Sequence, residues 1–176
     1  MEASGSADVS PIIIVTRADL DAGNAQATSD SSASVHSSAD LSGFIAANIQ
    51  ADSSLGEVKS SSDSVSVTYK QHAKLFGFVP MMIDATATIS ADGSVQISYP
   101  WYAFVFVKGS GSLESKIKGV AMVDLGSNAS AAVAANGKLS AATQAKLISD
   151  IRAMMWSELN ADASASASAS GSASVQ

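Results

Sequence analysis

The stretch from residue 81 to residue 107 constrains the fold more than any other part of the chain. In its first part, apolar residues at every second position (Met81, Ile83, Ala85, Ala87, Ile89) alternate with polar ones. The pair at positions 92–93, Asp-Gly, tolerates the positive φ of a tight turn, and the alternation then resumes from residue 95 to residue 99. This pattern predicts an antiparallel β-hairpin with one buried face and one exposed face.

The alternation ends at Pro100, which cannot donate a hydrogen bond to a ladder and therefore indicates an edge or a bulge. The stretch beyond it is apolar on both faces and rich in aromatic side chains. Because Trp and Tyr dominate binding hot spots, we regard these side chains as candidate contacts for a ligand or a partner. They are Trp101, Tyr102, Phe104 and Phe106, together with Tyr99 directly before Pro100. The alternative is that these rings pack as core under the helices.

The neighbouring segments supply further strands and three helices. Residues 63–75 alternate regularly and predict a strand, whereas residues 55–59 fit either a short strand or a loop. Helices are expected from Ser38, Ser112 and Ser140, each a residue type that caps a first turn. Their apolar stripes recur every three to four residues. They contain Leu41, Phe44, Ile45 and Ile49; Leu113, Ile117, Val120, Ala121 and Leu125; and Leu147, Ile148, Ile151, Met154 and Met155.

These elements predict an α+β fold with two layers. An antiparallel meander of three to four strands is covered on one face by three helices, and the domain spans residues 38–160. We expect residues 1–37 to be an extended or disordered arm rich in Ser and Ala, and residues 161–176 to be a flexible low-complexity tail.

One apolar island interrupts the N-terminal arm. Residues 11–16 are β-branched after a proline, which is typical of a short strand. This strand either lies along the edge of its own sheet or adds to the sheet of another subunit. In the second case the assembly strand consists of Ile12, Ile13, Ile14 and Val15.

Composition and spacing disfavour several classes of function. The chain has no cysteine and a formal charge of −6, so disulfides and thiolate chemistry are excluded and nucleic acid is not expected as a partner. No apolar run reaches the ~20 residues that span a bilayer. The bases His36 and His72 lack a catalytic motif, and the acidic residues from Asp19 to Asp30 fit a solvated turn better than a calcium loop. We therefore expect no catalytic residue, no metal and no cofactor.

The order of elements, the strand that runs through Pro100 and the lysine-containing helix start at Lys108 and residues 113–118 (LESKIK) resemble the small polyhydroxyalkanoic acid system proteins. The resemblance covers residues 38–126, and the Gly-Ser-Gly insertion at 109–111, the third helix and both tails depart from it. It implies a helix–meander–helix plan and a non-enzymatic protein associated with a hydrophobic surface.

Two hypotheses about function follow. The first is a structural or interaction protein that assembles with itself or with a protein partner through the aromatic end of the sheet, and through the strand at residues 11–16. The second is a binding module for a small apolar ligand or a hydrophobic surface. A serine hydrolase is disfavoured because suitable bases are scarce.

Overall fold

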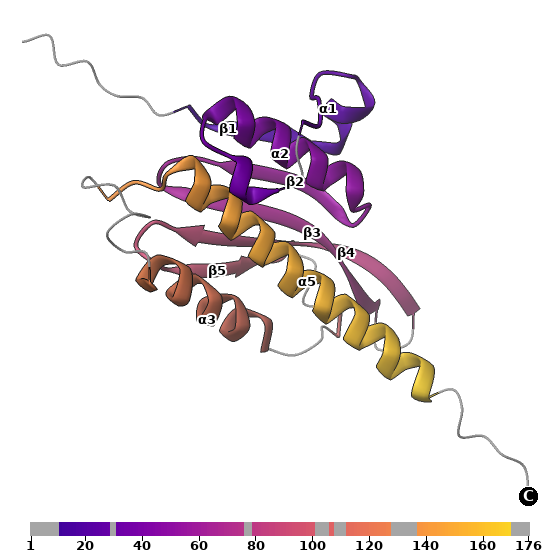
Figure 1. The fold of residues 1–176 in the computed structure, drawn as a ribbon. Coiled ribbons are helices and arrows are strands. Elements are labelled where there is room, and N and C mark those ends of the chain that lie inside the picture. Colours follow the sequence, from indigo (N-terminus) through magenta and orange to yellow (C-terminus); the bar gives the residue numbers. More distant parts are fainter. Residues whose placement is uncertain are drawn as a thin grey trace, which may run out of the picture.

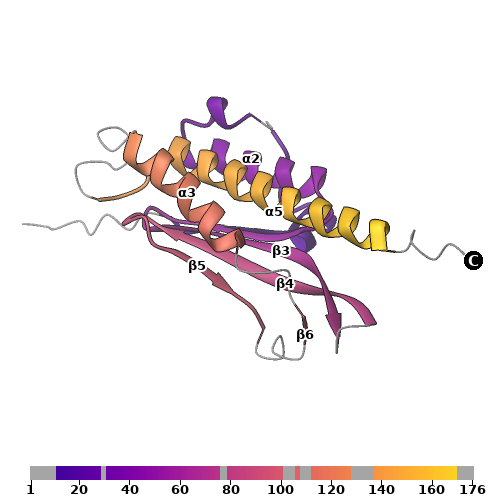
Figure 2. The same ribbon diagram turned by 90° about the horizontal axis from the view of Figure 1, so that it is seen from below.

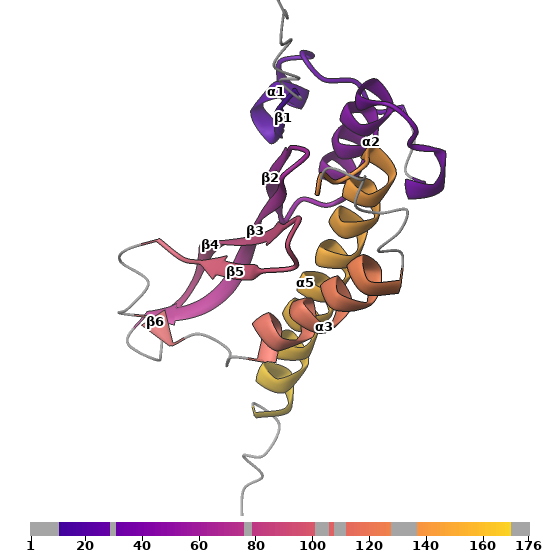
Figure 3. The same ribbon diagram turned by 90° about the vertical axis from the view of Figure 1, so that its left-hand side faces the viewer.

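The computed structural model describes residues 11–28, 31–75, 79–100, 106–107, 112–127 and 137–169. The fold is α+β, as predicted: an antiparallel sheet forms one layer, and the main helices pack on one of its faces (Figure 1). Figures 2 and 3 show α2, α3 and α5 on the same side of the sheet.

The sheet has more strands than the expected three to four. Its path runs β1-β2-β3-β4-β5 with every neighbouring pair antiparallel, and a short sixth strand pairs with the end of β3. The segment that fitted either a strand or a loop is the full strand β2. The strands are β1 (Ile13–Thr16), β2 (Leu55–Ser60), β3 (Ser64–Leu75), β4 (Val79–Ser90), β5 (Val95–Ser98) and β6 (Phe106–Val107).

The hairpin between β4 and β5 is confirmed. Gly93 has φ +83°, in the left-handed region that glycine adopts without strain. Across the turn, the backbone N–H of Ser90 donates to the carbonyl of Ser94, and the Asp92 carboxylate accepts the N–H of Ser94 at 2.8 Å. The ladder stops at Ser98, two residues before Pro100, which agrees with the break in alternation.

The helices begin close to the expected serines. Ser37, rather than Ser38, caps α2: its hydroxyl accepts the N–H of Asp40 at 3.1 Å, and the Asp40 carboxylate accepts the N–H of Ser37 at 3.0 Å. Ser140 caps α5 as expected, because its hydroxyl accepts the N–H of Thr143 at 3.2 Å. The helices are α1 (Arg17–Asp21), the 3₁₀ turn η1 (Ser32–Ser34), α2 (Ser38–Ala51), α3 (Ser112–Ser127) and α5 (Ala141–Ala169).

The core lies between the inner face of the sheet and the three main helices. Most of the alternating strand residues point into it, and so do the stripes predicted for the first and third helices. Met81, which the alternation predicted on the buried face, is instead 44% exposed, because β3 and β4 extend there beyond the neighbouring strands. Its largest fully buried side chains are Tyr69, Phe44, Leu41, Ile45, Ile49, Leu55, Ile89, Ile117, Leu147, Ile148, Ile151 and Val35.

The domain extends beyond the expected limits of residues 38 and 160. Val15 and Val35 belong to the core, so the segment expected as an extended or disordered arm supplies β1, α1, η1 and two core side chains. At the other end, the backbone of α5 continues to Ala169, inside the expected tail. Alternating Ser and Ala suits such an extension, because alanine is the best helix former.

Candidate functional site

The structure describes only part of the predicted aromatic set. Tyr99 is half-buried and packs against the core. Phe106 lies in β6, where its backbone pairs with Leu75, and its side chain is outside the described residues. Trp101, Tyr102 and Phe104 also lie outside the described residues. Their role as ligand or partner contacts stays a prediction.

The predicted assembly strand lies on the edge of its own sheet, where it pairs with β2. Val15 is buried and Ile13 is partly buried against the core, whereas Ile12 is 70% exposed and Ile14 is 52% exposed. Only these two isoleucines are therefore presented to solvent. No described strand pairs with the outer edge of β1.

A second apolar surface lies where β3 and β4 project beyond their neighbours. β2 pairs with β3 only as far as Tyr69, and β5 pairs with β4 only from Thr86 to Ile89. The remainder, residues 70–75 and 79–84, forms a two-stranded ribbon that we call the ribbon end; β6 lies beside its residues 74–75. The ribbon end diverges from α5 (Figures 2 and 3).

Three large apolar side chains of the ribbon end are exposed. Val79, Met81 and Met82 are 38%, 44% and 45% exposed, respectively. Because successive strand residues point to opposite faces, Met81 and Met82 place apolar surface on both sides of the ribbon.

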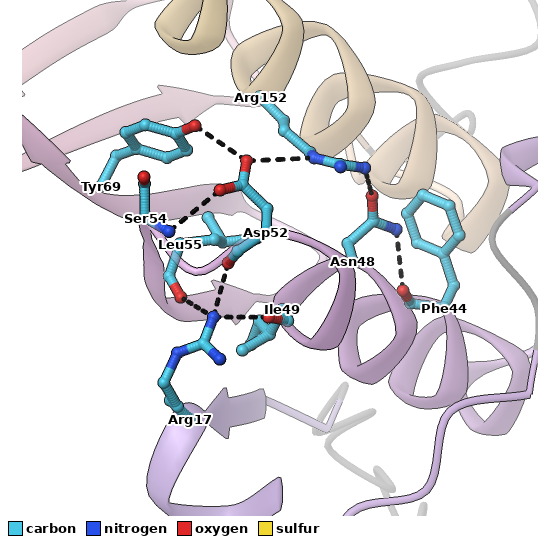
Figure 4. A network of polar contacts seen from close by, with 9 residues as sticks. All are labelled: Arg17, Phe44, Asn48, Ile49, Asp52, Ser54, Leu55, Tyr69 and Arg152. Atoms are coloured by element: carbon cyan, nitrogen blue, oxygen red, sulfur yellow. Dashed lines mark hydrogen bonds and ion pairs between the residues drawn. The ribbon is translucent and has the colours of Figure 1, made fainter. Parts of the chain in front are cut away.

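A polar network joins α2, β3 and α5 around the Asp52 carboxylate, whose side chain is only 4% exposed (Figure 4). The carboxylate accepts the Tyr69 hydroxyl at 2.8 Å, the N–H of Ser54 at 3.0 Å and Nε of Arg152 at 3.4 Å. Burial of the ring, followed by the hydrogen bond to Asp52, raises the pKa of Tyr69 well above its ordinary value of 10.0. Tyr69 is therefore a neutral donor and Asp52 a fully engaged acceptor, an arrangement suited to structure rather than to proton transfer.

Arg17 and Asn48 extend this network. Nη2 of Arg17 donates to the carbonyls of Ile49, Asp52 and Leu55 and so binds the negative end of α2. Its Nε is buried and has no hydrogen-bond partner among the described residues. Oδ1 of Asn48 accepts a hydrogen bond from Nη1 of Arg152 at 2.7 Å, and Nδ2 of Asn48 donates one to the carbonyl of Phe44 at 2.8 Å.

An open pocket of ≈ 450 Å³ lies beside the network, between the end of α2 and α5. Its lining includes Arg152, Ser53, Ser149 and Trp156, whose side chain is 54% exposed. This pocket was not predicted from the sequence. Two positions in the sequence could have indicated it. Arg152 is a charged residue among the apolar residues of its helix, and Trp156 is a large aromatic residue outside the apolar stripe.

The described part of the chain contains neither a candidate metal cluster nor a membrane-spanning helix. No group of three or more His, Asp or Glu side chains gathers there in a way that suits a metal ion. None of the helices in this part is long and apolar enough to cross a bilayer.

The chain matches no protein-family model, no curated protein and no solved structure.

Proposed function

We propose that the chain is a non-enzymatic interaction protein that assembles with a second copy of itself through the ribbon end. The observation that carries this proposal is the joint exposure of Met81 and Met82 on opposite faces of a ribbon along which neither β2 nor β5 continues. Methionine side chains are flexible and polarisable, so they adapt to the shape of an apolar partner.

The backbone of the ribbon end supports the same proposal. No described strand pairs with the outer edge of β4 from Val79 to Ala85, and such an edge can accept a further strand. Pro80 lacks an N–H and limits such pairing, which favours contact through side chains. Phe106, one of the predicted aromatic contacts, pairs through its backbone with Leu75 at the end of β3.

Sedimentation velocity over a range of protein concentrations tests the proposal. The wild-type chain is expected to associate as concentration rises, and the variant Met81→Ser/Met82→Ser is expected to remain monomeric. Met122→Ser, on α3, is the matched control because Met122 is 56% exposed and lies outside the ribbon end. A wild-type chain that stays strictly monomeric at high concentration would contradict self-assembly.

The second candidate is a binding module for a hydrophobic surface. Exposed apolar side chains on both faces of the ribbon end, together with the resemblance described above, favour it over a small-ligand module. Adsorption of the chain to alkane-coated particles measures this activity directly. If the chain is monomeric but its adsorption falls in Met81→Ser/Met82→Ser and not in Met122→Ser, surface binding replaces self-assembly as the function.

A further inference from the structure

The pocket beside Arg152 is lined by one face of α5. Ser149, Arg152, Ala153 and Trp156 are spaced by three or four residues, which brings them onto one side of the helix. Opposite them lie the last residue of α2 and the three residues that follow it, 52–54. The pocket is therefore built by two elements that the Asp52 network holds together.

Trp156 supplies a flat apolar wall that the fold does not use. The core takes Ile151 and Met155 from the same part of α5, whereas Trp156 is 54% exposed at the pocket. Ala153, which shares the lining, is small and leaves room beside the indole. An exposed indole face carries partial negative charge and attracts polarised C–H groups.

Arg152 supplies a donor held in a fixed orientation. Its Nε contacts Asp52 at 3.4 Å and its Nη1 contacts Asn48 at 2.7 Å. Nη2 makes no hydrogen bond to a described residue, and the side chain is 33% exposed. The guanidinium can thus donate to a ligand in the pocket without breaking a contact that it already makes.

The charges around the pocket favour a neutral ligand over an anion. Arg152 and Asp52 are the charged residues of the lining, and because the Asp52 carboxylate offsets the charge of Arg152, the pocket has no net positive charge to attract an anion. The hydroxyls of Ser53 and Ser149, in the lining, can both donate and accept hydrogen bonds.

We propose that this pocket binds a neutral sugar ring. The C–H face of the ring would pack on the indole of Trp156, and its hydroxyls would bond to Nη2 of Arg152 and to the serine hydroxyls. A volume of ≈ 450 Å³ accommodates a ligand of this size, and an apolar wall with a few convergent polar groups is the usual construction of a small-molecule site. This site is separate from the ribbon end and does not depend on the function proposed for it.

The test uses the full chain with Trp101→Phe, so that Trp156 is the only tryptophan. Its fluorescence is titrated with methyl β-glucoside, methyl β-galactoside, methyl α-mannoside and N-acetylglucosamine, and with glycerol and benzoate as comparisons. At least one sugar is expected to give a saturable change with a Kd on the order of millimolar, and glycerol none. If none of the four sugars gives a saturable change, or if benzoate binds more tightly than all of them, the proposal is overturned.

Variants then place the binding at this pocket. In ligand-detected NMR, Trp156→Ala is expected to weaken sugar binding by about tenfold or more, and Ser149→Ala by a smaller factor. Both side chains are outside the Asp52 network, so the fold should persist. Met122→Ala, at a similarly exposed position on α3, should bind as wild type does. Unchanged affinity in Trp156→Ala would overturn the assignment.

Discussion

At the scale of single residues, Asp52 is the polar centre of the fold. Its side chain is almost fully buried, and a buried carboxylate is tolerated only when it is paired and hydrogen-bonded. Tyr69 from the middle of β3, Ser54 from the turn before β2 and Arg152 from α5 meet this requirement. The network fixes the position of α5 relative to the end of α2, and it also orients the donor of the proposed sugar site.

Replacing Tyr69 with Phe tests this centre. The variant removes one donor to Asp52 and should lower the free energy of unfolding by about 1–3 kcal/mol at pH 7, as measured by urea denaturation. Because burial raises the pKa of Tyr69 in the folded state, its contribution is fully present below pH 10 and is lost as pH rises above that value. Tyr69→Phe should therefore weaken the loss of stability above pH 10. If the free energy of unfolding falls equally in variant and wild type above pH 10, Tyr69 is not the group that causes the loss.

Asp40 gives the opposite pH dependence. The hydrogen bond from Ser37, followed by that from the His36 backbone, lowers the pKa of this carboxyl below 3.8. A lowered folded-state pKa means that the stabilisation is present above the unfolded-state value and is lost as pH falls through the folded-state value. Asp40→Asn should thus have a lower Tm than wild type at pH 7, and the difference should shrink towards pH 3. A Tm difference that stays constant between pH 7 and pH 3 would show that the ionised Asp40 carboxylate does not provide this stabilisation.

At the scale of elements, the distance between a helix and its neighbours decides whether a glycine in that helix can be replaced by a larger residue. Gly43 in α2 lies directly against Thr28: a Cβ at this position would meet the Thr28 side chain, whose own Cβ is 2.9 Å away. The N–H of Thr28 also donates to the Gly43 carbonyl at 3.3 Å. In contrast, a Cβ at Gly119 in α3 meets no atom within 4 Å.

These two glycines form a matched pair for mutation. Alanine is the better helix former, so Gly119→Ala should raise the free energy of unfolding by up to about 1 kcal/mol. Gly43→Ala should instead lower it by about 1–3 kcal/mol, because the contact with Thr28 forces the backbone to shift. Urea denaturation of both variants checks the opposite signs, and stabilisation by Gly43→Ala would show that α2 does not approach Thr28 as described.

At the scale of the whole molecule, the N-terminal segment is part of the domain. β1 forms one edge of the sheet, Val15 and Val35 enter the core, and Arg17 binds three carbonyls near the end of α2. Removing this segment would expose the edge of β2 and leave these carbonyls without their donor. The domain boundary is therefore a matter of tertiary contacts and not of local composition.

Two truncated chains test this boundary. A chain of residues 11–169 should unfold cooperatively with nearly the stability of the full protein. A chain of residues 38–169 should be destabilised by several kcal/mol, on the order of the loss of two buried valines and a hydrogen-bonded arginine, and should aggregate through its exposed edge. Equal thermal stability of the two chains would show that residues 11–37 do not belong to the domain and that the expected limits of 38–160 are correct.

The sequence by itself determined the elements whose signals are local and repeated. The alternation in β3, β4 and β5, the Asp92-Gly93 turn and the stripes of α2 and α5 predicted the hairpin, the two layers and most of the core side chains. Each of these signals extends over many residues, because a strand or helix that buries one face must repeat its pattern along its length.

Only the tertiary structure decided the remainder. The sequence predicted a short strand at residues 11–16, but its place at the edge of its own sheet depends on pairing with β2. α1 carries too few residues to show a period, and Arg17 connects it to the end of α2. The ribbon end is exposed because β2 and β5 stop short of it, which depends on the lengths of neighbouring strands. The Asp52 network joins residues up to 104 positions apart in sequence. Such convergence leaves no local pattern, because it depends on how separate elements meet in space.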